Sequence, residues 1–188
     1  ANRLADLWKY DPATNMWTWM KGTTTANQVG NYGTKGVPLA TNQPGSRGYP
    51  DPTCWVDHAA GKLYMFSGYG YAKTTTLGYV DDLWEYDMST NMWTWIGGSD
   101  LLNETGNYGT IGVAASGNLP PARANNAYWQ DAAGNAWIFG GQSTAGGYFC
   151  DLWKYELATG LWTWVKGSSV AVNTNGVYGS RGIPNGAN

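Results

Sequence analysis

The chain has 188 residues, with 11 Lys and Arg against 13 Asp and Glu and a formal net charge of −2 at pH 7. This length suits one domain with a sizeable core. The lack of a basic run argues against a nucleic-acid partner, and the lack of an apolar run of about 18 residues predicts that nothing spans a membrane. The 12 Trp, 13 Tyr and 27 Gly are typical of a chain with many tight turns.

The first predicted element is a β-hairpin. Trp8 and Tyr10, then Trp17 and Trp19, fall at every second position, which is the period of a β-strand. Between them, Asp-Pro-Ala-Thr-Asn indicates a turn, because Pro presets φ and the polar side chains bond the local backbone. The same pattern occurs three times, over residues 6–19, 82–95 and 151–164.

A second hairpin pattern precedes each later copy. Residues 54–57 and 62–68 read as two strands joined by a turn that contains Gly61, and residues 129–131 and 136–141 repeat them. Long crossings rich in Gly, Thr and Asn link the repeats. They cover residues 20–46 and 96–122, and a similar stretch follows the third copy.

One repeat therefore predicts four short antiparallel strands with aromatic residues on both faces. Neither face can be left in water, so each sheet has to stack on its copies, and radial stacking of four-stranded sheets is a β-propeller. We expect one propeller domain, or part of one. It divides into the outer two strands of a first blade with a crossing in residues 1–46, a complete blade with a crossing in 47–122, and a complete blade with a crossing in 123–188.

The repeat resembles a known family. Gly140-Gly141 closes the second strand, with Ser67 at the first of these positions in the preceding repeat, and a Tyr and then a Trp follow. This pattern resembles kelch repeats. Asp-Leu-Trp-Lys-Tyr-Asp-Pro-Ala-Thr-Asn-Met-Trp-Thr-Trp followed by Tyr-Gly-Thr-x-Gly resembles more closely the long-loop, galactose-oxidase-like kelch repeats of exported bacterial proteins. The resemblance implies an all-β fold of kelch-like β-propeller blades, about two and a half blades of an incomplete ring.

Both ends of this array are expected to be open. The chain starts on the third strand of a blade and stops short of the Arg that would start the next one. Either the chain is part of a longer protein or several chains complete the ring together. The first alternative is favoured, because exposed strand edges in a free monomer invite pairing.

The working face is expected at the end of the blades that carries the long loops, because loops on a rigid scaffold are where recognition usually lies. One extended loop, between Tyr69 and Asp81, occurs once. Its candidate ligand-binding residues are suited to stacking on a sugar ring or pressing against a protein: Tyr69, Tyr71, Lys73 and Tyr79.

Other candidates recur in the repeats. Tyr32 and Tyr108 lie in the Tyr-Gly sequences of the crossings, and Arg47 and Arg123 open the two complete repeats. A feature present in every repeat is expected to hold the blade together. The alternative is a ring of Tyr and Arg around a ligand.

Catalytic chemistry finds little support in the sequence. Copper-radical oxidases need two His ligands, whereas His58 is the one histidine and falls on the short-turn end. Cys54 and Cys150 are interpreted as half-buried thiols, with one disulfide as the alternative. Strand-initiating turns account for two acidic pairs, Asp81 with Asp82 and Asp6 with Asp11. We expect no catalytic residue, no metal and no cofactor.

The sequence thus favours a non-catalytic interaction or structural module that binds a protein partner, itself or a glycan through the long-loop face. The Trp-, Asn- and Thr-rich, Lys-poor composition favours an extracellular or cell-surface location. The alternative is a fragment of a carbohydrate-active kelch enzyme, galactose-oxidase-like or a sugar isomerase, whose catalytic residues lie in other blades.

Overall fold

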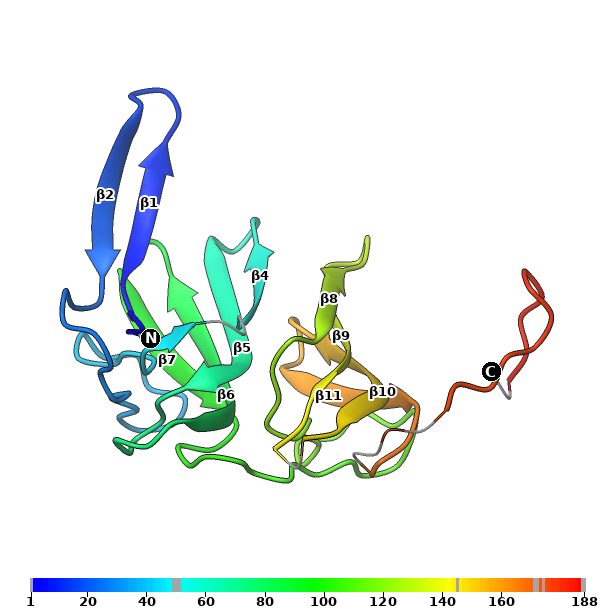
Figure 1. The fold of residues 1–188 in the computed structure, drawn as a ribbon. Coiled ribbons are helices and arrows are strands. Elements are labelled where there is room, and N and C mark those ends of the chain that lie inside the picture. Colours follow the sequence, from blue (N-terminus) through cyan, green and yellow to red (C-terminus); the bar gives the residue numbers. More distant parts are fainter. Residues whose placement is uncertain (1, 49–51, 145, 171–172, 174, 187–188) are drawn as a thin grey trace.

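The computed structural model describes residues 2–48, 52–144, 146–170, 173 and 175–186. These residues form eleven β-strands and no α-helix, so the fold is all-β (Figure 1). The strands are β1 (Leu7–Asp11), β2 (Met16–Lys21), β3 (Arg47–Gly48), β4 (Thr53–Asp57), β5 (Lys62–Gly70), β6 (Gly78–Asp87), β7 (Met92–Gly97), β8 (Ala127–Gln130), β9 (Ala136–Gln142), β10 (Tyr148–Glu156) and β11 (Leu161–Lys166). A helix able to cross a membrane is not found in this described part of the chain.

The strands form three antiparallel sheets, which we call blades 1, 2 and 3. Blade 1 is the hairpin β1–β2, blade 2 has the order β4–β5–β6–β7 with β3 also pairing with β5, and blade 3 has the order β8–β9–β10–β11. The blades follow one another in chain order and do not close into a ring (Figure 1). The predicted fold class is confirmed.

Cross-strand aromatic pairs define the hairpin that recurs in every blade. In blade 1, Trp8 lies opposite Trp19 and Tyr10 lies opposite Trp17. The same register recurs in the other blades, as Trp84 with Trp95, Tyr86 with Trp93, Trp153 with Trp164 and Tyr155 with Trp162. The hairpin predicted from the two-residue period is therefore present three times.

Two boundaries differ from the sequence-based expectation. The predicted loop between Tyr69 and Asp81 is shorter, because β5 continues to Gly70 and β6 already begins at Gly78. Tyr69 and Tyr79 consequently lie opposite each other on paired strands. Arg123 was expected to start a strand, but β8 begins only at Ala127.

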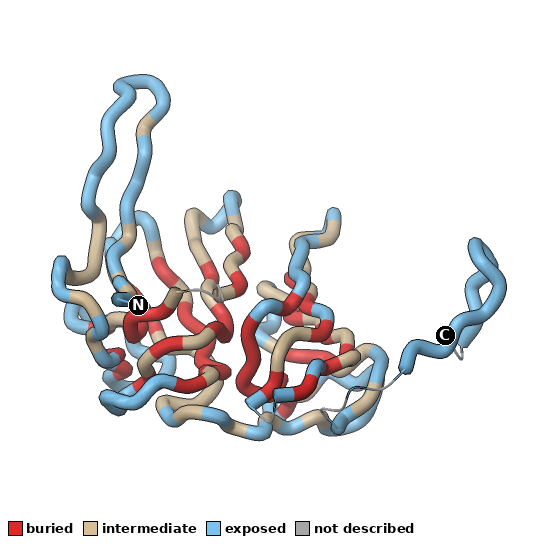
Figure 2. The backbone as a smooth tube through the Cα atoms, viewed as in Figure 1, coloured by how far each residue is buried: buried red, intermediate tan, exposed pale blue. Residues whose placement is uncertain are grey.

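The core forms where blades 2 and 3 face each other. Trp162 of β11 packs against Trp55 of β4 and Phe66 of β5, with ring centroids 6.2 and 5.0 Å apart. All three side chains are buried. Buried residues concentrate in blades 2 and 3, whereas the hairpin of blade 1 is mostly exposed (Figure 2). The same aromatic sequence is therefore core in two blades and surface in the third.

Candidate functional site

A buried carboxylate organises the long-loop end of blade 2. Arg47 donates two hydrogen bonds to Asp82, from Nη1 to Oδ1 at 2.9 Å and from Nη2 to Oδ2 at 2.8 Å. The Tyr32 hydroxyl and the Trp84 indole N–H also donate to Oδ2, at 2.7 and 2.8 Å. Burial, followed by the nearby Asp82 charge, raises the pKa of Tyr32, so its hydroxyl keeps its proton and acts as a donor.

The same network recurs in blade 3. Arg123 binds both oxygens of Asp151 at 2.7 Å, and the Tyr108 hydroxyl and Trp153 indole donate to Oδ2 at 2.6 and 2.8 Å. Burial acts to raise the pKa of Asp151, but the hydrogen bonds from these three residues and the Arg123 charge hold it below its usual value. Asp151 is therefore a buried anion whose charge is stabilised by hydrogen bonds from Arg123, Tyr108 and Trp153.

These networks include four candidate residues. Tyr32, Tyr108, Arg47 and Arg123 bind the two carboxylates and so link the crossings to the blades. Asp82 had been attributed to a turn, which is wrong, because it is the buried partner of Arg47. The available signal was the recurrence of Asp directly before Leu-Trp in all three copies.

The first and second crossings each clamp onto the blade that follows. In the first crossing, the Gly36 N–H donates to the Trp95 carbonyl at 2.8 Å. Lys35 lies over the Trp95 ring, with Nζ 4.3 Å from the centroid, and donates to the Gly98 carbonyl at 2.7 Å. The second crossing repeats the backbone bond from Gly112 to Trp164 at 2.7 Å. We use the term crossing clamp for three residues of a crossing: the tyrosine that binds the buried carboxylate, this glycine, and the residue directly before the glycine.

Blade 1 carries the same hairpin, and none of the crossings in the described part of the chain clamps it as in blades 2 and 3. Among the described residues, the side-chain donor to Asp6 is the Trp8 indole, at 2.7 Å. Trp17 is 65% exposed, whereas Trp93, at the same repeat position in blade 2, is 5% exposed. Trp8 and Trp19 are also exposed. We call β1–β2 with Asp6 the open hairpin.

Two aromatic side chains of blade 3 are exposed although their counterparts in blade 2 are buried. Trp129 and Phe139 of blade 3 are 43% and 48% exposed, whereas their counterparts in blade 2, Trp55 and Phe66, are 2% and 0% exposed. Beyond blade 3, the C-terminal crossing extends away from the body (Figure 1). Its clamp tyrosine, Tyr178, is 92% exposed.

The four candidates of the extended loop do not converge on one site. Tyr69 and Tyr79 pack edge to face with ring centroids 5.0 Å apart. Lys73 forms an exposed ion pair with Asp100 at 3.1 Å. Tyr71 is half-buried, and its backbone N–H donates to the Ser46 carbonyl at 3.0 Å.

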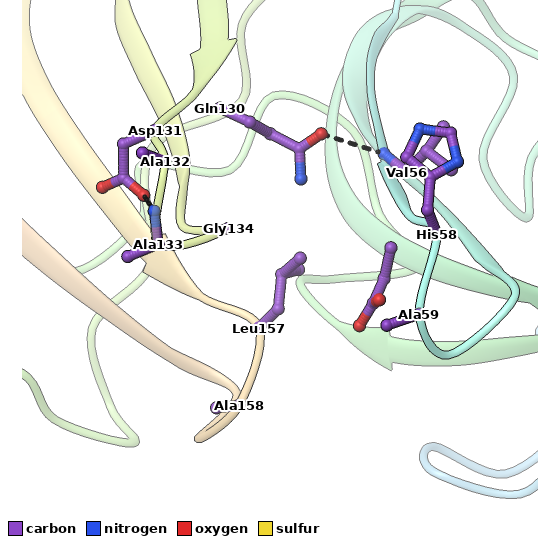
Figure 3. Close-up of a pocket in the computed structure, with 11 residues that line it drawn as sticks. Val56, His58, Ala59, Gln130, Asp131, Ala132, Ala133, Gly134, Leu157 and Ala158 are labelled. Atoms are coloured by element: carbon purple, nitrogen blue, oxygen red, sulfur yellow. Dashed lines mark hydrogen bonds between the residues drawn. The ribbon is translucent and has the colours of Figure 1, made fainter.

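A shallow pocket of about 490 Å³ lies at the short-turn end, between blades 2 and 3 (Figure 3). It is lined by three turns, residues 56–59, 130–134 and 157–158. Hydrogen bonds from the Asn135 and Trp137 side chains, both 2.9 Å, lower the pKa of Asp131 to about 2. His58 is exposed and projects from the opposite wall, so the pocket does not pair an acid with a base.

Asp81 is a singular buried acid that sequence reasoning attributed to a turn. It occupies the position of Ala5 in blade 1 and Cys150 in blade 3. One oxygen accepts the Ser99 N–H at 3.0 Å, and the other has no hydrogen-bond partner within the described residues. Burial is the largest cause that raises the pKa of Asp81 to about 7. In the same described residues, no cluster of three or more His, Cys, Asp or Glu could hold a metal ion.

Comparison with known proteins supports the fold. No family model matches the chain, and no curated protein matches it. Among solved structures, the structure of YjhT matches with a TM-score of 0.55 and 16% sequence identity, over 87% of this chain and 46% of that chain. This chain thus spans about half of the YjhT chain, and the similarity is one of fold.

Proposed function

We propose that this protein is a non-catalytic interaction module that binds a protein partner through the exposed aromatic face of its first hairpin, β1–β2. The observation that carries the proposal is the exposure of Trp17, which is 65% exposed where the equivalent Trp93 and Trp162 are 5% and 4% exposed. Exposed contiguous aromatic surface on a β-protein marks an interaction site.

The backbone of the open hairpin supports the same conclusion. In the described part of the chain, β1 pairs with β2 alone, whereas β6 and β10, the equivalent strands, each have a partner on both sides. An unpaired edge is a template for another strand. Blade 1 therefore offers both an aromatic face and a row of backbone groups to a protein partner.

The finer assignments belong to this proposal. The Gly-Gly, Tyr and Trp pattern supports membership of the kelch repeats, and the Lys-poor composition supports an extracellular or cell-surface location. A glycan is a weaker candidate than a protein, because the extended-loop tyrosines Tyr69 and Tyr79 pack on each other rather than offer free ring faces side by side. The enzyme alternative places catalysis in blades outside this chain.

Photo-crosslinking tests the proposal. A photoreactive phenylalanine analogue at position 17 of the full chain should become covalently linked to protein upon irradiation in the producing culture. The control carries the analogue at Leu101, a residue of the second crossing that is 51% exposed. Equal labelling from both positions would contradict binding at the open hairpin. Peroxide production from sugars or alcohols by the copper-loaded protein isolated from its source would establish the oxidase form of the enzyme alternative instead.

A further inference from the structure

We propose that a small cavity between blades 2 and 3 binds an organic carboxylate. Both blades, the second crossing and Lys35 of the first crossing line this cavity, whose volume is about 220 Å³. We call it the interblade cavity. None of its lining residues in the described part of the chain belongs to β1–β2, so this site is additional to the protein-binding face proposed above.

A glycine in blade 3 leaves one hydroxyl of the interblade cavity without its usual acceptor. In blade 2, the Tyr86 hydroxyl donates to the Asn91 side chain at 2.7 Å, and blade 1 repeats this bond at the same distance. Gly160 stands at the asparagine position in blade 3, so Tyr155 lacks that acceptor. Tyr155 and Gly160 both line the cavity, and the hydroxyl lies 3.7 Å from where a Cβ of residue 160 would stand.

The vacant acceptor position calls for an oxygen atom of a ligand. Burial, followed by the charge of Glu85, raises the pKa of Tyr155 to about 12, so its hydroxyl keeps the proton at neutral pH and donates. The acceptor in the other two hairpins is the carbonyl oxygen of an asparagine side chain. A carboxylate oxygen accepts the same bond more strongly, because it is charged. A ligand with a carboxylate therefore replaces the missing asparagine.

The charges around the interblade cavity favour an anion. Lys35 Nζ donates one hydrogen bond, to the Gly98 carbonyl at 2.7 Å, and an ammonium group has three donors. None of the described lining residues is acidic. Glu85, whose charge acts on Tyr155, forms an ion pair with Lys62 at 2.6 Å. The cation that faces the ligand is thus Lys35, and its free N–H groups suit a carboxylate.

The size and the walls of the cavity define the rest of the ligand. Leu83, Ile96 and Ala115 contribute apolar side chains to the lining, and Ser116 contributes a hydroxyl. The volume of about 220 Å³ is below the about 300–1,000 Å³ of sites for drug-sized ligands. A short aliphatic chain that ends in a carboxylate matches both the walls and the volume.

Titration of the full chain with butyrate, followed by saturation-transfer NMR of the ligand, tests the proposal. Wild type should bind butyrate saturably, with a dissociation constant on the order of 1 mM, which is about half of the limiting affinity per atom for a ligand of six non-hydrogen atoms. Butyramide has nearly the same shape without the charge, and it should bind at least about 10-fold more weakly. Equal affinity for the two compounds would overturn the assignment of a carboxylate.

Gly160→Asn is the decisive variant, because the repeat itself carries asparagine at this position in two hairpins. Gly160 has a φ of 70°, and Asn15 and Asn91 adopt 56° and 57°, so the backbone accepts asparagine here. The new side chain should bind the Tyr155 hydroxyl, occupy the place of the carboxylate and weaken butyrate binding at least about 10-fold. A variant that fills the cavity without strain separates loss of binding from loss of fold.

Two lysine variants test the charge. Lys35→Met should weaken butyrate binding about 10-fold, because it removes the ammonium group from the cavity. Lys166→Met is the matched control, since Lys166 is also exposed and bonded to a carbonyl but lies outside the described lining, and it should bind like wild type. Near-UV circular dichroism on each variant verifies the fold.

Two results would overturn the proposal: wild type that shows no saturable binding of butyrate, or equal affinity of wild type and Gly160→Asn. Neither result affects the partner of the open hairpin, which photo-crosslinking from position 17 tests separately.

Discussion

The buried ion pair of blade 3 gives the sharpest stability prediction. In Asp151→Asn, one carboxylate oxygen becomes an amide N–H₂ that faces the donors of Arg123. The side chains of Arg123 and Asp151 are both 0% exposed, and their shortest contact is 2.7 Å. The substitution therefore leaves a buried guanidinium without its counter-charge.

The expected cost follows from that burial. Removing one partner of a buried, hydrogen-bonded ion pair costs about 3–5 kcal/mol, because the remaining charge stays desolvated. Tyr108 and Trp153 also lose a charged acceptor. A domain of this kind is stable by about 5–15 kcal/mol, so the variant should lose a large fraction of its free energy of unfolding.

Urea unfolding followed by tryptophan fluorescence measures the effect, with an unchanged m-value as evidence of an intact native state. Asp6→Asn is the matched control, because Asp6 holds the same repeat position but is exposed. This control should change the free energy of unfolding by less than about 0.5 kcal/mol. Equal costs at the two positions would refute the argument from burial.

Three further predictions follow from single positions. Because burial raises the pKa of Asp81 from its ordinary value of 3.8 to about 7, the folded state binds more protons than the unfolded state between these pH values. Stability should therefore fall as pH rises from about 4 to 7, by at most about 4 kcal/mol, and Asp81→Asn should flatten this slope in thermal melts. Gly98→Ala should cost about 1–3 kcal/mol in urea unfolding, because φ is 73° and a Cβ would meet the Asp81 carbonyl, whereas Gly36→Ala, with φ of 80° and open space around it, should cost less. Lys73→Ala should change stability by less than about 1 kcal/mol, because its ion pair is exposed, and a larger loss in the same assay would show that the loop is more tightly held than its surface position implies.

The contacts of the candidate site are long-range, and the sequence did not predict them. Arg47 and Asp82 are 35 positions apart, and no local pattern indicates that they meet. The recurrence of Arg, Tyr and Asp in the repeats could be read as a ligand ring or as packing. Only the buried geometry shows that these residues bind one another.

The sequence by itself determined the hairpins, because strand period and turn chemistry are local. Alternating aromatics and the Asp-Pro-Ala-Thr-Asn turn specify β1–β2 as fully as they specify β6–β7. The tertiary structure alone decided which copy is core and which is surface. Trp17 and Trp93 stand in nearly identical sequences yet are 65% and 5% exposed, because burial depends on whether a neighbouring blade and crossing cover the ring.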